Sequence, residues 1–247
     1  MATVKDIYNF IDSIAPFNMQ EEWDNSGLIV GNENAEVTKI LFALDATSDV
    51  IDQAIIYGAD LIITHHPVIF KAISNVLCDS LVYKLINHNI SIICAHTNYD
   101  KAQDGVNDTL CKIVGFDNFI KVENTCLNIG NFEKEMSTDN FINHIKNVLD
   151  CVVRYNNLSK DIKKIAVCSG SGSDYLSFAK ELNCDALLTG DASHHAFLDA
   201  EEVDIVLVAA GHFETENIAI EPLMNRIKEK FSITCELATQ KSPIITF

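Results

Sequence analysis

Histidine and carboxylate side chains recur at a four-residue spacing in this chain. His96 is followed by Asp100, and His212 by Glu216. On a helical turn this spacing puts an imidazole and a carboxylate on one face, about 5–6 Å apart at Cβ, where both can bind one metal ion. With eight histidines and 35 acidic residues in 247, about one such pair is expected by chance, and the chain has a third that begins at His195. The first two pairs gain weight because they follow equivalent predicted strands in the two halves of the chain, which resemble each other.

Two adjacent histidines stand in Thr64-His65-His66-Pro67, directly after the predicted strand Leu61–Thr64. Neighbouring side chains on a regular strand point to opposite faces, but the backbone turns at a strand end, so both imidazoles can reach one cleft. Taken alone, the pair is equally consistent with two solvated loop residues. Two divalent ions share a centre when a carboxylate can bridge them and each ion has a nitrogen ligand. We therefore predict a dinuclear metal site whose ligands are His65, His66, Asp100, His212 and Glu216.

The second half of the chain carries Thr189-Gly190-Asp191 where the first half carries Thr64-His65-His66. Because Gly190 and Asp191 replace the two histidines, we expect the metal to be bound here by His65 and His66 of the first half and not by their counterparts in the second half. His195 is then left as a candidate acid or base in the pocket. His96 is the other candidate for proton transfer.

Two further residues have alternative interpretations. Asp45 follows a predicted strand end, where it either orients a ligand histidine from behind or belongs to the start of a helix. Trp23, the only tryptophan, lies in Glu22-Trp23-Asp24-Asn25-Ser26-Gly27. It either walls a pocket or anchors packing.

Short apolar runs alternate with helical patterns along the whole chain, which is typical of an α/β fold with largely parallel sheets. Ligands of such sheets bind at the carboxyl ends of the strands. The predicted strands are Leu28–Val30, Ile40–Leu44, Leu61–Thr64, Ile90–Ala95, Val152–Tyr155, Ile165–Cys168, Ala186–Thr189, Ile205–Ala209 and Ile233–Leu237. The predicted helices are one between Thr3 and Pro16, Asp49–Tyr57, Ser80–Asn87, Gly105–Val114, Thr138–Leu149, Asp174–Leu182 and Glu221–Phe231.

The two halves of the chain also resemble each other. Three segments of the first half have counterparts in the second, at offsets of 125, 125 and 116 residues. The pairs are Lys39–Leu44 with Lys164–Ser169, Gly58–Thr64 with Asn183–Thr189, and Ile92–His96 with Val208–His212. Unrelated α/β units also share apolar patterning, but the shared Asp, Thr and His positions favour duplication. We predict two α/β repeats, residues 1–125 and 126–247, whose strand ends surround one central cleft.

Composition limits the classes of partner. The net charge of −17 opposes binding to nucleic acid or to an anionic membrane surface, since both depend on clustered Lys and Arg. A chain of this length can bury a full core without a structural metal, so a bound metal should be functional. The eight cysteines have no CxxC spacing, which favours a reduced, cytoplasmic protein. We expect no signal segment and no membrane span.

Several of these motifs together resemble the NIF-three-like family, also named GTP cyclohydrolase I type two homologues. The motifs are Glu22–Leu28, Asp45-Ala46-Thr47, Thr64–Pro67, His96–Asp100, Thr189-Gly190-Asp191 with His195, and Gly211–Glu216. The resemblance covers nearly the whole chain and matches the short form of the family, without an inserted domain. It implies a dinuclear centre with the five ligands named above, Glu216 as the bridge, and two intertwined α/β repeats. It also implies a toroidal homohexamer built as a trimer of dimers.

The function expected from these features is metal-dependent hydrolysis of a nucleotide or phosphoester. In a cyclohydrolase, water would attack C8 of guanine, with His96 or His195 carrying the proton. Ligands of this type suit Zn, Fe, Mn, Co or Ni. The alternative is a non-catalytic metal-binding regulatory or scaffold protein.

Overall fold

The chain is divided into two compact units. The computed structural model describes residues 1–245. Unit 1 contains Met1–Gly105 and Ala219–Lys241, and unit 2 contains Val106–Ile218 and the described residues from Ser242. The chain therefore leaves unit 1 after residue 105 and returns to it at residue 219. The predicted repeat boundary at residue 125 concerns sequence duplication and stays a prediction.

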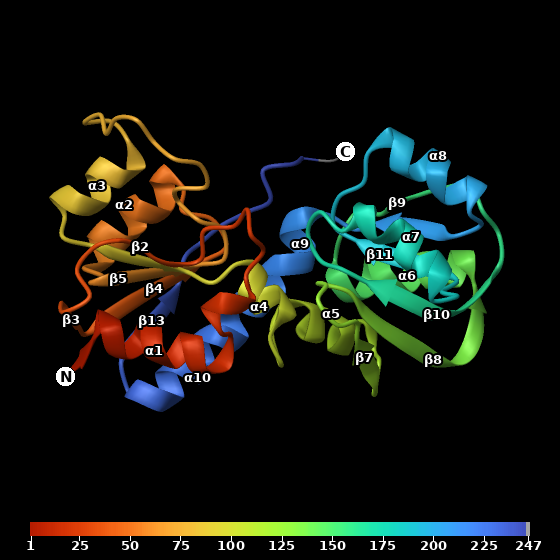
Figure 1. The fold of residues 1–247 in the computed structure, drawn as a ribbon, viewed down its shortest axis with the longest axis horizontal. Coiled ribbons are helices and arrows are strands. Elements are labelled where there is room, and N and C mark those ends of the chain that lie inside the picture. Colours follow the sequence, from red (N-terminus) through yellow and green to blue (C-terminus); the bar gives the residue numbers. More distant parts are fainter. Residues whose placement is uncertain (246–247) are drawn as a thin grey trace. The chain divides into compact units, whose positions relative to one another are not determined.

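Unit 1 is built on a five-stranded sheet with the order β13-β4-β5-β6-β2. The first four strands are mutually parallel, and β2 is antiparallel to β6. Helices α2 and α3 cover one face, and α1 and α10 lie on the other (Figure 1). The strands are β1 (Ala2–Thr3), β2 (Gly27–Val30), β3 (Glu36–Val37), β4 (Lys39–Ala43), β5 (Leu61–Thr64), β6 (Ser91–Cys94) and β13 (Thr234–Leu237). The helices are α1 (Val4–Ile14), α2 (Ser48–Tyr57), α3 (Leu81–Asn87), α4 (Thr97–Lys101) and α10 (Ile220–Phe231), with a short 3₁₀ turn at Phe17–Met19.

Local sequence signals explain where these elements begin and end. Thr3 caps α1, because its hydroxyl accepts from the backbone N–H of Asp6 while the Asp6 carboxylate accepts from the backbone N–H of Thr3, a capping box. Gly58 ends α2 in the left-handed region at φ 72°, where glycine has no Cβ penalty. The strands β4, β5 and β6 are buried on both faces, as parallel strands between helical layers must be.

Unit 2 is built on a six-stranded sheet with the order β7-β8-β10-β11-β12-β9. Its three central strands, β10, β11 and β12, are parallel, and the other three pair antiparallel. The strands are β7 (Phe119–Lys121), β8 (Asn128–Ser137), β9 (Arg154–Tyr155), β10 (Asp161–Val167), β11 (Ala186–Thr189) and β12 (Val206–Ala209). The helices are α5 (Val106–Val114), α6 (Thr138–Leu149), α7 (Leu176–Glu181), α8 (His194–Glu202) and α9 (His212–Glu216), with 3₁₀ turns at Ser173–Tyr175 and Asn217–Ala219.

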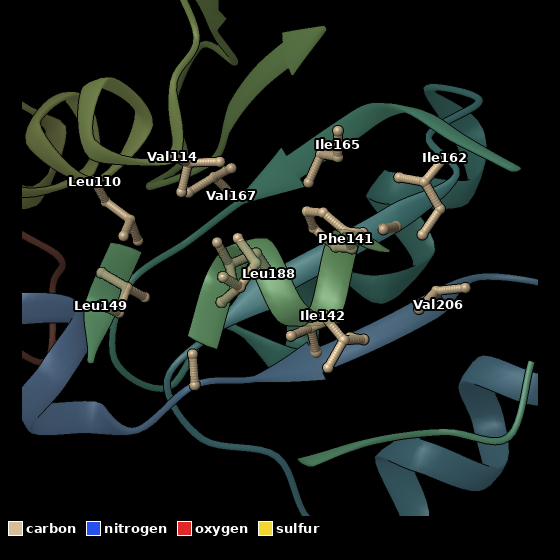
Figure 2. Close-up of a cluster of buried hydrophobic side chains, with 14 of the residues drawn as sticks. Leu110, Val114, Phe141, Ile142, Leu149, Ile162, Ile165, Val167, Leu188 and Val206 are labelled. Atoms are coloured by element: carbon tan, nitrogen blue, oxygen red, sulfur yellow. The ribbon is translucent and has the colours of Figure 1, made fainter. Parts of the chain in front are cut away.

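The core of unit 2 lies on both faces of this sheet. On one face, side chains of α5 and α6 such as Leu110 and Phe141 pack against Ile165, Leu188 and Val206 (Figure 2). On the other face, residues of α7 and α8 pack against the alternate strand positions. The observed class is thus mixed α/β with largely parallel sheets, as predicted. The central cleft between the repeats stays a prediction.

The two units share a detailed pattern of hydrogen bonds. In unit 1, Asp60 Oδ2 accepts from the backbone N–H of Lys39, and Lys39 Nζ donates to a carbonyl oxygen at the end of α2, at 3.1 and 2.9 Å. In unit 2, Asp185 Oδ2 accepts from the backbone N–H of Lys164, and Lys164 Nζ donates to a carbonyl oxygen just after α7, at 2.8 and 2.6 Å. Lys39 and Lys164 are 125 positions apart in the sequence, and so are Asp60 and Asp185. Apolar patterning alone does not produce matching polar contacts, so they support duplication.

The third matched strand differs from the sequence prediction by one residue. Strands β6 and β12 are equivalent at an offset of 115, because β6 pairs with β5 in the same register in which β12 pairs with β11. The predicted offset of 116 is therefore wrong within the strand. Gly211, at φ 94°, is the extra residue after β12 and restores the offset of 116 between His96 and His212.

Every predicted strand and helix overlaps an observed one. The predictions did not include β7, β8, α4, α8 or α9, nor the short β1 and β3. All eight cysteines are free. None of the helices within residues 1–245 combines the length and apolarity needed to cross a bilayer.

Candidate metal centre

The first group of candidate ligands lies at the carboxyl ends of β5 and β6 in unit 1. Strand β5 ends at Thr64, so His65 and His66 follow it directly, and β6 ends at Cys94, two residues before His96. One ring nitrogen from each histidine lies within 4.8 Å of the others. The adjacent histidines thus reach one place, as predicted, and His96 joins them.

His65 is held in the tautomer that a metal ligand needs. Its side chain is buried, and Nδ1 lies 2.9 Å from the carbonyl oxygen of Ala95. A carbonyl oxygen only accepts hydrogen bonds, so Nδ1 carries the proton and the neutral ring offers its Nε2 lone pair. The thiol of Cys94 donates to the His65 carbonyl at 2.9 Å. Burial raises the pKa of the Cys94 thiol, which favours the protonated form that donates this hydrogen bond.

Asp100 lies on α4, which begins directly after His96. The backbone N–H of Asp100 donates to the carbonyl oxygen of His96 at 3.0 Å, and this helical turn brings the carboxylate to the buried end of the sheet. Asp100 Oδ1 lies 3.5 Å from His65 Nε2. Two ligands each about 2.1 Å from one ion are about 3.0–3.4 Å apart, so the observed separation is close to, and slightly longer than, that of two ligands of one cation. Together, His65, His66, His96 and Asp100 form the unit 1 half-site.

His66 is oriented by a carboxylate at the end of the neighbouring strand. Its Nδ1 lies 2.7 Å from Asp45 Oδ1, which leaves Nε2 for a metal. The side chain of Gln240 fixes the backbone around Asp45, since its Oε1 accepts from the N–H of Leu44 at 2.7 Å and its Nε2 donates to the carbonyl oxygen of Asp45 at 3.1 Å. The structure therefore places Asp45 behind a predicted ligand, the first of its two predicted roles.

His96 has the same arrangement with Asp24. Its Nδ1 lies 2.7 Å from Asp24 Oδ1, and Asp24 also accepts from the hydroxyl and the backbone N–H of Thr97. Burial raises the pKa of the Asp24 carboxyl, but the hydrogen bonds from His96, Thr97 and Asn25 outweigh it and hold the pKa well below its usual range. Asp24 is therefore a fixed negative charge behind the imidazole of His96.

The second group of candidate ligands lies in unit 2, on the five-residue helix α9 after β12. His212 begins this helix and Glu216 ends it, and His212 Nε2 lies 3.0 Å from Glu216 Oε2. On the other side of the ring, His212 Nδ1 lies 2.7 Å from Asp191 Oδ2. Glu216 is buried. His212 and Glu216 form the unit 2 half-site, and their separation also suits two ligands of one ion.

The unit 2 half-site depends on space left by a glycine. Gly170 follows β10 and adopts φ 56°. A Cβ at this position would lie 2.0 Å from Glu216 Oε1 and 3.3 Å from His212 Nε2. The Gly170 carbonyl oxygen also accepts from the backbone N–H of Asp191 at 2.8 Å. The backbone thus approaches the carboxylate so closely that only a residue without a side chain fits.

The other predicted residue of the site, His195, lies in the first turn of α8. Its ring contacts His194, with centroids 5.7 Å apart. Among the described residues, His195 belongs to none of the groups of three ligating atoms within 4.8 Å. Its acid or base role stays a prediction.

Sequence reasoning missed three residues that shape the two half-sites, namely Asp24, Asp191 and Gly170. For Asp191 a signal existed, since the same 21-residue separation joins Asp45 to His66 and Asp191 to His212. In unit 1 this spacing joins the ends of β4 and β5, whereas in unit 2 it joins the ends of β11 and β12. Asp24 is 72 residues from His96, a distance at which no local spacing indicates contact.

Comparison with known families agrees with the motifs. The family model Duf34/NIF3 (NGG1p interacting factor 3) matches residues 2–246. A Clostridium perfringens protein named "GTP cyclohydrolase 1 type 2 homolog" is 37% identical over 251 residues, covering 96% of each chain.

Solved structures share the fold over the full length. A crystal structure of the Staphylococcus aureus protein SA1388 superposes with a TM-score of 0.90 at 28% identity, covering 100% of this chain and 99% of the other. A Bacillus cereus protein related to NIF3 has a TM-score of 0.91 at 22% identity, with coverage of 100% and 99%.

Proposed function

This chain belongs to the Duf34/NIF3 family, and on that premise we propose that it is a metal-dependent hydrolase of a nucleotide or phosphoester. The unit 1 and unit 2 half-sites jointly supply its dinuclear centre. The ligands are His65, His66 and Asp100 from unit 1 with His212 and Glu216 from unit 2. The joint use of the half-sites rests on the chemistry of each one and on the resemblance to the family.

The observation that carries this proposal is the state of the imidazoles. Each Nδ1 in the half-sites has an acceptor at 2.7 to 2.9 Å, a carbonyl for His65 and a carboxylate for His66, His96 and His212. Such partners fix each ring and its tautomer, which directs the Nε2 lone pair of a ligand histidine towards a metal and makes Nε2 of His96 the proton acceptor. Histidines that serve only as solvated loop residues do not need four separate orienting acceptors.

The charge of the half-sites also favours cations. Asp100 and Glu216 are buried carboxylates beside imidazole nitrogens, and a cation bound at such a pair would offset the cost of burying the negative charge. Nitrogen and oxygen donors suit Zn, Fe, Mn, Co or Ni, without selecting one. When two such ions are bound, they lower the pKa of a coordinated water and polarise the oxygen atoms of a substrate.

The residues around the ligands hold or move protons. Asp24 keeps the proton of His96 on Nδ1, so His96 Nε2 can accept a proton from water and return it to a leaving group. His195 is the second proposed proton carrier. The name carried by the Clostridium perfringens relative makes GTP the first nucleotide to test, with attack at C8 of guanine.

Assembly and location are part of the same proposal. By resemblance to the family, we expect a homohexamer built as a trimer of dimers, located in the cytoplasm. Sedimentation of the purified protein measures the mass of the assembly directly, and a monomeric mass would contradict the hexamer.

The decisive experiment combines metal analysis with a substrate panel. The purified chain is reloaded with each of the five metals, its metal content is measured, and turnover of GTP, other nucleotides and phosphoesters is assayed. Glu216→Gln removes the charge of a proposed ligand, and Glu202→Gln changes an exposed glutamate of unit 2 as a matched control. We expect two ions per wild-type and control chain, fewer in Glu216→Gln, and turnover only where both ions are bound.

The outcomes separate the hypotheses. Metal binding without turnover of any compound in the panel would overturn the hydrolase and favour the non-catalytic metal-binding scaffold. Turnover of a phosphoester but not of GTP would remove only the cyclohydrolase version. Equal metal content in Glu216→Gln and wild type would overturn the metal centre itself.

A further inference from the structure

Two large aromatic side chains are exposed beside the unit 1 half-site. Trp23 is 59% exposed and Phe70 is 46% exposed, and their ring centroids are 5.7 Å apart with an interplanar angle of 41°. A tryptophan that anchors packing is mostly buried. The exposure therefore does not suit a packing anchor, the second of the two predicted roles of Trp23.

Both rings lie against His96. Their centroids are 6.0 Å (Trp23) and 6.1 Å (Phe70) from the centroid of the imidazole, which they meet edge to face. The His96 centroid is in turn 5.0 Å from that of His65 and 5.4 Å from that of His66. The aromatic pair is thus one ring away from the proposed ligands of the metal.

Hydrogen bonds hold the two segments that carry these rings. Asn25, two residues after Trp23, donates from Nδ2 to the carbonyl oxygen of Ile69 at 2.6 Å, which ties the Trp23 segment to the residue before Phe70. The backbone N–H of Asn25 donates to Asp24 Oδ1 at 2.7 Å, the same atom that contacts His96 Nδ1. The segments are therefore fixed to each other and to the half-site while the rings stay open to solvent.

We propose that Trp23 and Phe70 form a subsite that stacks the planar heteroaromatic ring of a ligand whose anionic end reaches the metal centre. The pair is called the aromatic subsite below. Its position deepens the proposed function and rests on it, because the metal centre is what would bind the anionic end. A nucleotide has both parts, a flat base and a phosphate.

The local charge supports this division of the ligand. The nearby acidic residues Asp24, Asp45 and Asp100 repel phosphate, and the neighbouring cation Lys101 is already paired with Glu21 at 2.7 Å. At the half-site itself phosphate would therefore need the metal ions, and Lys71, exposed next to Phe70, adds a positive charge beside the aromatic pair. A neutral ring gains from contact with exposed aromatic faces whatever the surrounding charge.

The single tryptophan makes the aromatic subsite directly observable. Because Trp23 is the only tryptophan in 247 residues, tryptophan emission from the full chain reports on this position alone. The probes are guanosine 5′-monophosphate and ribose 5-phosphate, which share the phosphate and differ in the planar ring. Each is titrated into the Zn-loaded protein, with fluorescence for the wild type and calorimetry for all variants.

The variants are Trp23→Leu, Trp23→Phe and Phe70→Leu, with Phe178→Leu as a control at a 43% exposed aromatic of unit 2. We expect guanosine 5′-monophosphate to quench Trp23 and to bind about 5- to 150-fold more tightly than ribose 5-phosphate, the range for one stacked base. Trp23→Leu and Phe70→Leu should each lose much of that factor, Trp23→Phe less, and Phe178→Leu none. Thermal melting confirms that each variant is folded, and Phe70→Leu tests the subsite independently if Trp23→Leu is not.

Three results would overturn the aromatic subsite. The first is equal affinity of the wild type for both probes, and the second is an affinity for guanosine 5′-monophosphate that is unchanged in folded Trp23→Leu and Phe70→Leu. The third is Trp23 emission that shifts with protein concentration alone, together with a rise in mass, since the rings would then pack between chains. Stacking without turnover would overturn the proposed hydrolase function but not the aromatic subsite. Turnover of a non-aromatic phosphoester that is unaffected by Trp23→Leu would support the hydrolase and overturn the role of the aromatic subsite.

Discussion

Replacing Gly170 by alanine should weaken metal binding by the unit 2 half-site while leaving the protein folded. The added Cβ would lie 2.0 Å from Glu216 Oε1, and contacts below about 3.0 Å do not occur between such atoms. The colliding atom is the end of a side chain, so the carboxylate moves and the sheet does not. A ligand oxygen must stay within about 0.2 Å of its bonding distance, whereas Glu216 must withdraw by about 1 Å.

The expected loss has two separable parts. Alanine at φ 56° costs about 1–2 kcal/mol of folding free energy because its Cβ crowds the backbone, which lowers the melting temperature by a few degrees in a chain of this size. The displaced carboxylate should lower metal affinity by about 10- to 100-fold. Gly58→Ala provides the control for the first part, since Gly58 has φ 72° and a Cβ there meets nothing closer than 3.8 Å.

The assay is chelator competition with Zn²⁺ or Mn²⁺ on wild type, Gly170→Ala and Gly58→Ala, together with thermal melting of each. Both variants should melt slightly below the wild type, and only Gly170→Ala should lose metal affinity. Wild-type affinity in Gly170→Ala would refute the reasoning, because Glu216 would then be displaced without consequence. Equal losses of affinity in both variants would show that backbone strain, and not the collision, is responsible.

Three other changes test the site and the core. Asp45→Asn keeps a hydrogen-bond acceptor for Nδ1 of His66 but removes the negative charge, so metal affinity should fall about 10-fold or more. An unchanged metal affinity in chelator competition would contradict this. Under native conditions iodoacetamide should modify the exposed Cys78 and not the buried Cys111, because burial raises the pKa of the Cys111 thiol to about 12 and keeps it protonated. Equal labelling of the two cysteines, measured by mass spectrometry, would be inconsistent with that burial. Leu188→Ala should cost about 2–5 kcal/mol in urea denaturation, since this side chain is fully buried, whereas the same change at the exposed Leu77 should cost less than about 0.5 kcal/mol, and similar values for both would contradict the assignment of the core.

Most of the fold could be predicted from the sequence because the central strands are buried on both faces. The strand Leu61–Thr64, for example, begins with three consecutive apolar residues at positions 61–63. Strand β8 (Asn128–Ser137) escaped prediction because its second half is mostly exposed and carries a polar sequence. Helices α4 and α9 have only five residues each, too few for a helical period to be recognised.

The proposed ligands could be predicted in part from local spacing, and of the residues that orient them only Asp45 was predicted. The four-residue spacing identified His212 and Glu216 because a single helical turn joins them. Asp24 was missed because its contact with His96 is created by the tertiary fold across 72 residues. Gly170 was missed because a need for empty space leaves no pattern in the neighbouring sequence.

The unit 1 half-site can be completed only late in protein synthesis, because strand β13 is synthesised near the end of the chain. This strand and Gln240, which secures the backbone at Asp45, come from the last residues of unit 1. During translation strands β4, β5 and β6 are therefore synthesised long before β13. The edge of β4 that pairs with β13 stays unpaired until β13 has left the ribosome. A chain terminated before Thr234 contains all five proposed ligands yet lacks the strand that closes this edge, and such an unpaired edge invites aggregation.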